Sequence, residues 1–403
     1  MELGAVLTAT ELEGCHPAAD WSLWIRRGRA PAPDARATDA FRTGWADDLD
    51  QLVALGVRSV QLTLEWAALE PRPGHHDADA LEARRQILAG ARERGLAVWG
   101  CLVDGTLPGW FADDEGGFSD DRGRNLLWPR HIDWVGEHLG DLVDGWVPQR
   151  EGIAWALRRH LLGEAPPGGR DVKTAAEAVR AAVLADGEAW RLLQGTAPVA
   201  TYQTVRPIRA TADDVKAAPR AAGLEALLWQ PWLTALTSGR LAVGDLPVRD
   251  TPHLRGAFDR VIVEVRPGVE VDGDGRWHPF PADGRRGPTG WVAWPEVMAE
   301  ALHRAVEELP DRPIVAAGSL ADVADDGRAR PDHLRAMLDA VADLGPADHE
   351  ATTNGLRGWW HTSPISGYHW RHGHDLSPGV IDADRSEAPA AEELRRRAPT
   401  SNA

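Results

Sequence analysis

The stretch WVPQREGIAWALRRHLLG, residues 146–163, joins a short apolar run to a segment with helical spacing. A strand followed directly by a helix is the repeating unit of parallel β/α proteins, whose functional side chains gather at the C-terminal ends of the strands. Glu151 stands at this junction, and we therefore expect it to be a functional carboxylate. The alternative is a solvated acid at a helix start, where the helix dipole favours negative charge.

The same alternation continues along the whole chain. Short apolar runs predict strands at Gly4–Thr10, Ser59–Trp66, Ala97–Asp104, Gly145–Gln149, Val199–Thr204, Arg260–Arg266, Pro313–Gly318 and Gly358–Thr362. Apolar residues at i, i+3 and i+4 predict helices between them, for example at Ala46–Leu55, Asp79–Arg94, Arg130–Leu142, Thr174–Leu193, Trp294–Glu308 and Pro331–Leu344.

Eight strands that alternate with helices predict an α/β fold of one domain, a (β/α)8 TIM barrel over residues 1–403. An open doubly wound sheet is the alternative, but no Gly-rich phosphate-binding loop follows the first expected strand. Two tracts rich in Gly, Pro and Asp, Ala30–Asp39 and Gly268–Thr289, are expected to be long loops on the catalytic face of the barrel.

Composition restricts the partners and the compartment. The formal net charge of −17 argues against nucleic acid as a partner, because phosphate binding requires a basic surface. No apolar run reaches the roughly 20 residues that span a bilayer, and the N-terminus lacks the basic region of a signal peptide. Two cysteines, Cys15 and Cys101, are too few for a disulfide framework. We therefore expect a cytoplasmic protein, and the dominance of Arg over Lys is typical of a GC-rich bacterial genome.

Eight segments together resemble one known family. The segments are TATELEG (8–14), FRTGWADDLDQLVALGVRSVQLTLEW (41–66), CLVDGTLP (101–108), WVPQREG (146–152), GEAPPG (163–168), FDRVIVEVR (258–266), RPIVAAGSLADVADDGRARPDHL (312–334) and LRGWWHTSPISGYHW (356–370). In this order they resemble glycoside hydrolase family 1, the β-glucosidase family, from end to end. The resemblance implies a barrel whose relatives cleave glycosides with a pair of carboxylates.

The resemblance finds a carboxylate at only one of the two catalytic positions of the family. Glu151 falls on the acid/base position of the WxTxNEP motif, with Arg150 in place of Asn and Gly152 in place of Pro. Gly318 falls on the position of the nucleophile in the ITENG motif, and the surrounding RPIVAAGSL contains no acid. A retaining glycosidase needs both carboxylates, so we do not expect ordinary double displacement.

Most expected sugar contacts are also replaced. Glu11 stands for a sugar-binding Gln, Asp104 for a His, Thr362 for a Trp and His369 for a sugar-binding Glu, while Trp370 is kept. The candidate substrate-binding residues are Glu11, Asp104, Arg150, Glu264, Arg266, His369 and Trp370. Trp370 could stack on a sugar, and His369 could be an acid, a base or a hydrogen-bond donor. Each of Glu11 and Asp104 could instead be an ordinary loop acid.

A charged pair, a single buried acid and a histidine group leave alternatives open. Glu264 and Arg266 share a strand face and could bind each other or the substrate. Glu65 shares a face with Gln61, which replaces an Arg that steadies the nucleophile in the family. A buried Glu must be paired or functional, and a structural ion pair with a barrel Arg is the preferred reading. The histidines near His369, namely His361, His372 and His374, have no diagnostic ligand spacing, so we expect no metal and no cofactor.

Three functions follow from this pattern. The first is an atypical glycosidase-like enzyme in which Glu151 is the general acid and Asp104, Glu11 or Glu264 is a distant base for inverting hydrolysis. The second is a lyase, isomerase or cyclase that uses Glu151 as its acid/base. The third is a pseudoenzyme that binds a ligand without turnover. The expected partner in each is a small glycoside or sugar-like molecule, and no oligomeric state is predicted.

Overall fold

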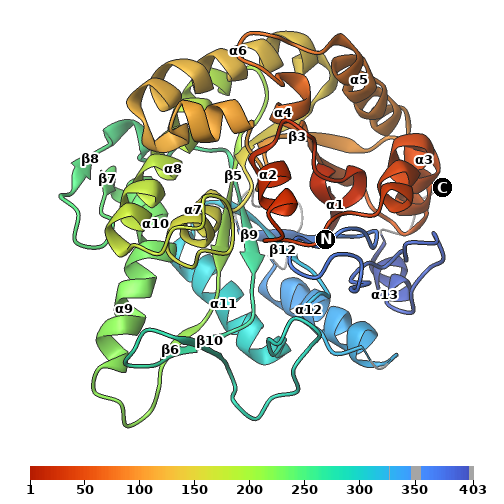
Figure 1. Ribbon diagram of the computed structural model, residues 1–403. Coiled ribbons are helices and arrows are strands. Elements are labelled where there is room, and N and C mark those ends of the chain that lie inside the picture. Colours follow the sequence, from red (N-terminus) through yellow and green to blue (C-terminus); the bar gives the residue numbers. More distant parts are fainter. Residues whose placement is uncertain (326, 346–354, 399–403) are drawn as a thin grey trace.

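A computed structural model describes residues 1–325, 327–345 and 355–398, and its centre is a barrel of eight parallel strands (Figure 1). The barrel strands are β1 (Glu2–Leu7), β2 (Ser59–Thr63), β3 (Ala97–Val103), β4 (Gly145–Gln149), β5 (Ala200–Val205), β9 (Arg260–Val265), β12 (Pro313–Gly318) and β13 (Gly355–Thr362). They are hydrogen-bonded in the order β4-β3-β2-β1-β13-β12-β9-β5. Parallel bridges between Trp146 and Val199 and between Arg150 and Tyr202 join β4 to β5 and close the ring. The predicted (β/α)8 barrel is confirmed.

Helices surround the barrel on its outside (Figure 1). They are α1 (Ala9–Glu13), α2 (Asp20–Arg26), α3 (Ala35–Ala54), α4 (Trp66–Leu69), α5 (Ala78–Glu93), α6 (Trp128–Leu139), α7 (Gly152–His160), α8 (Val172–Leu193), α9 (Ala217–Leu228), α10 (Gln230–Ser238), α11 (Pro295–Glu308), α12 (Ala329–Leu344) and α13 (Ala391–Arg397). Side chains cap α5 and α8. Asp77 accepts hydrogen bonds from the first turn of α5, and Asp171 accepts one from Thr174 at the start of α8.

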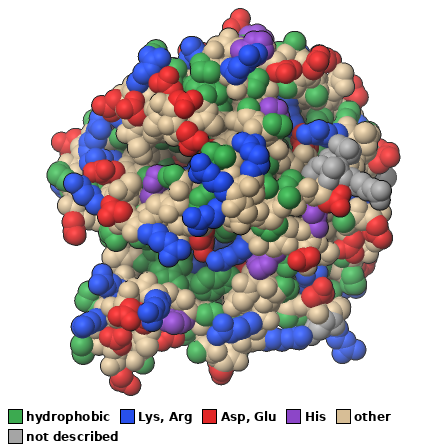
Figure 2. Space-filling model, in the orientation of Figure 1, with side chains coloured by type: hydrophobic (Ala, Val, Ile, Leu, Met, Phe, Trp, Pro, Cys, Tyr) green, Lys and Arg blue, Asp and Glu red, His purple; other side chains and the backbone are tan. Residues whose placement is uncertain are grey.

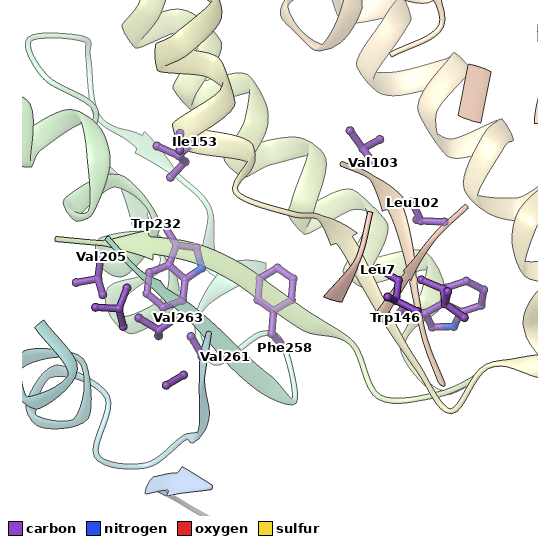
Figure 3. Close-up of a cluster of buried hydrophobic side chains, with 14 of the residues drawn as sticks. Leu7, Leu102, Val103, Trp146, Ile153, Val205, Trp232, Phe258, Val261 and Val263 are labelled. Carbon is purple, nitrogen blue, oxygen red and sulfur yellow. The ribbon is translucent and has the colours of Figure 1, made fainter. Parts of the chain in front are cut away.

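Two hydrophobic layers hold the barrel together. The interior is filled by Val6, Trp99, Cys101, Val147, Ala200, Tyr202, Ile262, Val315, Ala317 and Trp360. The alternate residues of each strand face outward and pack against the helices, and Figure 3 draws part of this outer layer, including Trp146 and Trp232. Trp99 and Trp360 fit because their neighbours are glycines. A Cβ at Gly4 would lie 2.2 Å from the Trp360 ring, and one at Gly145 would lie 2.5 Å from Trp99.

Several predicted boundaries are wrong, each for a local reason. The first strand ends at Leu7 instead of Thr10, because Ala9–Glu13 forms helix α1. The second ends at Thr63, since the backbone turns into helix α4. The expected loop Ala30–Asp39 is helical from Ala35 onward, where α3 begins.

The second expected loop, Gly268–Thr289, contains two short strands, β10 (Val269–Val271) and β11 (Trp277–Pro279). They form a small sheet with β6 (Ile208–Ala210), which lies beside α9 away from the barrel (Figure 1). A further two-stranded ribbon pairs β7 (Arg240–Leu241) with β8 (Arg249–Asp250). Across the described part of the chain, no helix combines the length and apolarity needed to cross a membrane.

Candidate functional site

A cavity of about 980 Å³ opens at the C-terminal ends of the barrel strands. Its lining includes Glu11, Asp104, Arg150, Glu151, Arg266, His369 and Trp370. Glu264, on β9, is fully buried behind this lining and bonds to Arg150 and Arg266. The structure therefore brings together the residues that the sequence singled out, apart from Gly318.

Glu151 occupies a strained position between β4 and α7. Its backbone has a φ of 53°, which is uncommon for a residue other than glycine and typical of functional sites that hold strain. The side chain is 1% exposed. The Thr204 hydroxyl donates to its Oε1 over 2.5 Å, and the Arg266 Nη2 donates to its Oε2 over 2.7 Å. The turn after β4 thus aims this carboxylate at the cavity and fixes its orientation.

Arginines determine the charge of Glu151. Burial by itself raises the pKa of the carboxyl, but the positive charges of Arg266, Arg158 and Arg150 outweigh burial and hold the pKa well below its usual range. A general acid at neutral pH needs a raised pKa. The neighbours of Glu151 thus stabilise its ionised form in the free protein. The role of general acid/base that the sequence assigns to it stays a prediction.

Beneath the cavity lies a set of paired charges, Asp104, Arg150, Glu151, Glu264 and Arg266, which we call the charged floor. Arg150 forms ion pairs with two carboxylates: its Nη1 lies 3.2 Å from Asp104 Oδ1, and its Nη2 lies 3.1 Å from Glu264 Oε2. Arg266 lies 2.9 Å from Glu264, so these two residues do bind each other as one of the sequence alternatives held.

Neutral groups add hydrogen bonds to the carboxylates of the charged floor. The hydroxyls of Thr8 and Thr63 donate to Asp104 Oδ2 over 3.0 and 3.1 Å. Tyr202 donates to Glu264 Oε2, and Thr362 donates to its Oε1 over 3.3 Å. Buried ion pairs repay their desolvation cost only when their remaining hydrogen bonds are satisfied. The carboxylates of the charged floor meet this condition, whereas the Nε of Arg150 is buried without a hydrogen-bond partner.

Glu11 differs from Glu151, because the pKa of its carboxyl is raised. It lies on helix α1, not at a strand end as expected, and it faces the same cavity. Removal from water raises the pKa of its carboxyl to about 7, and this effect exceeds the opposing influence of Arg150 and of a hydrogen bond with Ser363. Ser363 also has a strained backbone, with a φ of 53°. Glu11 can therefore exchange a proton near neutral pH.

Gly318 does not point at the cavity. Val315 and Ala317 face the barrel interior, so the alternation of β12 turns residue 318 outward. A Cβ on Gly318 would lie 2.6 Å from the Trp359 ring in the outer layer. The residue of this strand end that lines the cavity is Ser319. The position expected for a nucleophile thus offers neither a carboxylate nor space for one.

Three tryptophans form one wall of the cavity. Trp21, Trp155 and Trp370 meet edge to face with ring centroids 6.0–6.1 Å apart. The ring of Trp370 is not a bare stacking platform, because His369 stacks on it with centroids 5.6 Å apart. Burial, followed by nearby positive groups, lowers the pKa of His369 to about 3, so the imidazole is neutral. Its Nδ1 accepts from the backbone N–H of Arg371, which leaves the ring proton on Nε2.

The remaining histidines are dispersed. His372 lines the cavity, whereas His361 lies on the outer side of β13. Burial, followed by the nearby His333 of α12, lowers the pKa of His361 to about 4. His374 accepts a hydrogen bond from the backbone of Asp34. Within residues 1–325, 327–345 and 355–398, no three His, Cys, Asp or Glu side chains are grouped so that they could hold a metal ion.

Glu65 does not form the expected ion pair. Both of its carboxyl oxygens accept from the Thr106 hydroxyl, over 3.1 and 2.9 Å. Arg84, which lies nearby, pairs with Glu13 instead. Burial raises the pKa of Glu65 to about 7. The partner of this buried acid is therefore a neutral hydroxyl.

Sequence reasoning missed two arginines at the cavity. Arg206 follows β5 directly and Arg158 lies two turns into α7, and both line the cavity. The rule that functional side chains follow barrel strands could have identified Arg206. A buried acid, Asp186 on α8, was also missed, because a single Asp in an Ala-rich helix carries no sequence signal.

Comparisons with known proteins find the same barrel fold and relatives in one family. The model of glycosyl hydrolase family 1 matches residues 31–231. A β-glucosidase of Agrobacterium sp. is 26% identical over 375 residues, which cover 84% of this chain and 79% of the relative. A β-glycosidase from Pyrococcus horikoshii superimposes with a TM-score of 0.82 at 21% identity, covering 99% of this chain and 97% of its own. The family 1 β-glucosidase from Thermotoga maritima, in complex with isofagomine lactam, gives 0.81 at 16% identity, with 98% and 96% covered.

Proposed function

The chain belongs to glycosyl hydrolase family 1, and from this premise we propose that it converts a glycoside or sugar-like molecule in the barrel-mouth cavity without double displacement. The observation that carries the proposal is the pairing of an ionised Glu151 with a protonatable Glu11 in one cavity. Two titratable groups whose surroundings push their pKa values apart are the usual mark of an acid and a base.

The missing second carboxylate supports the exclusion of double displacement. A retaining glycosidase places two carboxyl groups about 5–5.5 Å apart, one of which attacks the anomeric carbon. Ser319 is the cavity-lining residue at the end of β12, and Gly318 faces Trp359. Asp104 and Glu264 are committed to Arg150 in the charged floor. No covalent glycosyl-enzyme is therefore expected.

The proposed roles reverse the assignment made from sequence. Glu11 donates its proton to the leaving oxygen as the C–O bond breaks. A water molecule attacks the anomeric carbon and gives its proton to the Glu151 carboxylate, so that hydrolysis proceeds with inversion. Solvent then returns a proton from Glu151 to Glu11. With water excluded, the same two groups would serve an elimination or an isomerisation, in which Glu151 removes a proton from carbon.

Binding without turnover is the second candidate, and one observation favours it. The Glu151 carboxylate is already hydrogen-bonded by Thr204 and Arg266, and Arg158 lies 3.8 Å from it. A base engaged in this way must loosen its ion pairs before it accepts a proton. The pseudoenzyme would use the same cavity and the same small sugar-like ligand.

The whole chain is proposed to act as one domain, since the strands nearest its two ends, β1 and β13, pair with each other. We also propose a cytoplasmic setting and a small-molecule partner. The net charge of −17 supports a partner other than nucleic acid.

The test compares Glu151→Gln and Glu11→Gln with Glu300→Gln, an exposed acid paired with Arg209. We expect very weak hydrolysis of aryl β-glucosides by every form. On a substrate found by screening glycosides, each cavity variant should lose at least about 100-fold in kcat, because Gln keeps the shape but cannot move a proton.

Two results would contradict this account. Full turnover by Glu151→Gln would make that carboxylate a bystander and favour the pseudoenzyme, with any activity arising elsewhere. A covalent adduct trapped by a 2-fluoro glycoside would show that another residue acts as nucleophile. The stereochemistry of the first-formed product, followed by NMR, separates inversion from retention directly.

A further inference from the structure

Two arginines at the rim of the cavity differ from those of the charged floor. Among the described residues, neither Arg158 nor Arg206 donates a side-chain hydrogen bond to a protein acceptor. Arg158 approaches one carboxylate, that of Glu151, at 3.8 Å, and the Nε of Arg206 is buried without a partner. Arg150 and Arg266, by contrast, each bond to two carboxylates.

Indole rings hold both rim arginines in place. The guanidinium of Arg158 lies 4.7 Å from the centroid of Trp155, and that of Arg206 lies 5.4 Å from Trp291 and 5.7 Å from Trp277. Stacking covers the flat face of a guanidinium and leaves the N–H groups on its edge free to donate. The aromatic side chains thus prepare donors that the protein itself does not use.

The surroundings of these arginines are basic although the chain is acidic. A second cavity of about 1170 Å³ adjoins the first and shares Arg158, Arg206 and Arg266 with it. Its lining also includes Arg371, which is paired with Glu164, and Arg276, which lies 3.6 Å from Asp274. Figure 2 shows basic side chains gathered near the middle of this face of the molecule. With a net charge of −17, such a concentration of positive charge is local and directed at the cavity.

The guanidinium of Arg206 stays charged at neutral pH. Burial, together with the nearby Arg266 and Arg158, lowers its pKa to about 10, which is still far above neutral pH. Two cations without hydrogen-bonded counterions are costly to keep beside each other unless an anion joins them.

We infer that Arg158 and Arg206 form an oxyanion site at the rim, so that the ligand of this barrel is an acidic sugar-like molecule that carries a carboxylate, phosphate or sulfate group. This inference rests on the proposed function, because it names the class of molecule that enters the same cavity. The planar guanidinium fork fits two oxygens of such a group at once. The acidic remainder of the chain repels polyanions, which restricts the site to small ligands.

The test measures binding of four probes by titration calorimetry, with ionic strength held constant by chloride. The probes are inorganic phosphate, glucose, glucose 6-phosphate and glucuronate. The variants are Arg206→Met and Arg158→Met, in which Met retains an unbranched apolar side chain. The control is Arg209→Met, whose guanidinium also lies over a ring, that of Phe280, but is already paired with Glu300.

We expect phosphate and at least one acidic sugar to bind the unaltered protein at least about tenfold more tightly than they bind either rim variant. Arg209→Met should bind them as the unaltered protein does. Arg206→Lys, which keeps the charge but loses the planar fork, should recover part of the affinity. The relative affinities of glucose 6-phosphate and glucuronate identify the phosphate or the carboxylate as the preferred group.

Equal phosphate affinity in the unaltered protein and in both rim variants would overturn the inference, as would glucose binding as tightly as both acidic sugars. A different result would contradict the proposed function but not the oxyanion site. In that case phosphate would bind less tightly to the rim variants than to the unaltered protein, while no sugar bound to any form. Circular dichroism of each variant confirms that it is folded, and the second rim variant serves if the first does not fold.

Discussion

The two sides of the cavity hold carboxyl groups in opposite states. On the β4 and β9 side, three guanidinium groups surround Glu151 and keep it ionised. On the α1 side, Glu11 is removed from water beside the hydroxyl of Ser363, and its pKa rises to about 7. Arg150 influences the pKa of both groups. Burial, weighed against neighbouring charges, therefore decides which carboxyl can hold a proton, and the position in a family motif does not.

Asp186 extends the same comparison beyond the cavity. It is buried on α8, and the groups that bond to it are amides, with the Gln149 Nε2 donating to its Oδ1 over 2.8 Å. Burial raises the pKa of Asp186 to about 8. Within a single fold, Glu151 beside three arginines thus has a lowered pKa, and Asp186 beside amides has a raised one.

Removal of Arg150 should have the largest effect. Arg150→Met leaves Asp104 and Glu264 buried without their shared counterion, and such a loss typically costs about 3–5 kcal/mol of unfolding free energy. Arg209→Met, which breaks an exposed pair with Glu300, should cost less than about 1 kcal/mol. Urea titrations of both variants provide the measurement. A loss below about 1 kcal/mol for Arg150→Met would show that the charged floor is not held by this residue.

The effect expected for Asp186→Asn depends on pH. The folded protein keeps the proton of Asp186 up to about pH 8, whereas an unfolded Asp releases it near its ordinary pKa of 3.8. The unaltered protein should therefore lose stability as pH rises from about 4 to 8, by up to about 1.4 kcal/mol per pH unit from this group. Asn cannot ionise, so the variant should gain relative stability across this range. Parallel stability curves for the two proteins would contradict a protonated Asp186.

The sequence alone predicted the barrel, because alternating apolar runs and amphipathic segments report burial that is set locally along the chain. It also predicted that Glu11, Asp104, Glu151 and Glu264 would converge, since the C-terminal ends of parallel strands meet at one mouth. Glu11 arrived there on a short helix, because the strand ended three residues before the expected boundary.

What the sequence could not provide depends on three-dimensional neighbours. Gly318 faces outward toward Trp359 because of which residues of β12 point into the barrel. A glycine has no side chain, so the sequence does not show which way it faces. The ionised state of Glu151 depends on Arg158 and Arg266, which lie 7 and 115 residues further along the chain. One face of the Trp370 ring is covered by His369, and this contact depends on how the loop that carries both residues folds.

The opposite protonation states of Glu151 and Glu11 can be measured most directly by titrating the two carboxyl groups and following them by NMR. Protein labelled with 13C at the Glu carboxyl carbon would be followed from pH 8 to pH 4, with Glu151→Gln and Glu11→Gln used to assign the two signals. We predict that Glu151 remains ionised throughout this range, while Glu11 takes up a proton near pH 7. A Glu151 signal that titrates at or above pH 6, or a Glu11 signal that is still ionised at pH 5, would contradict it.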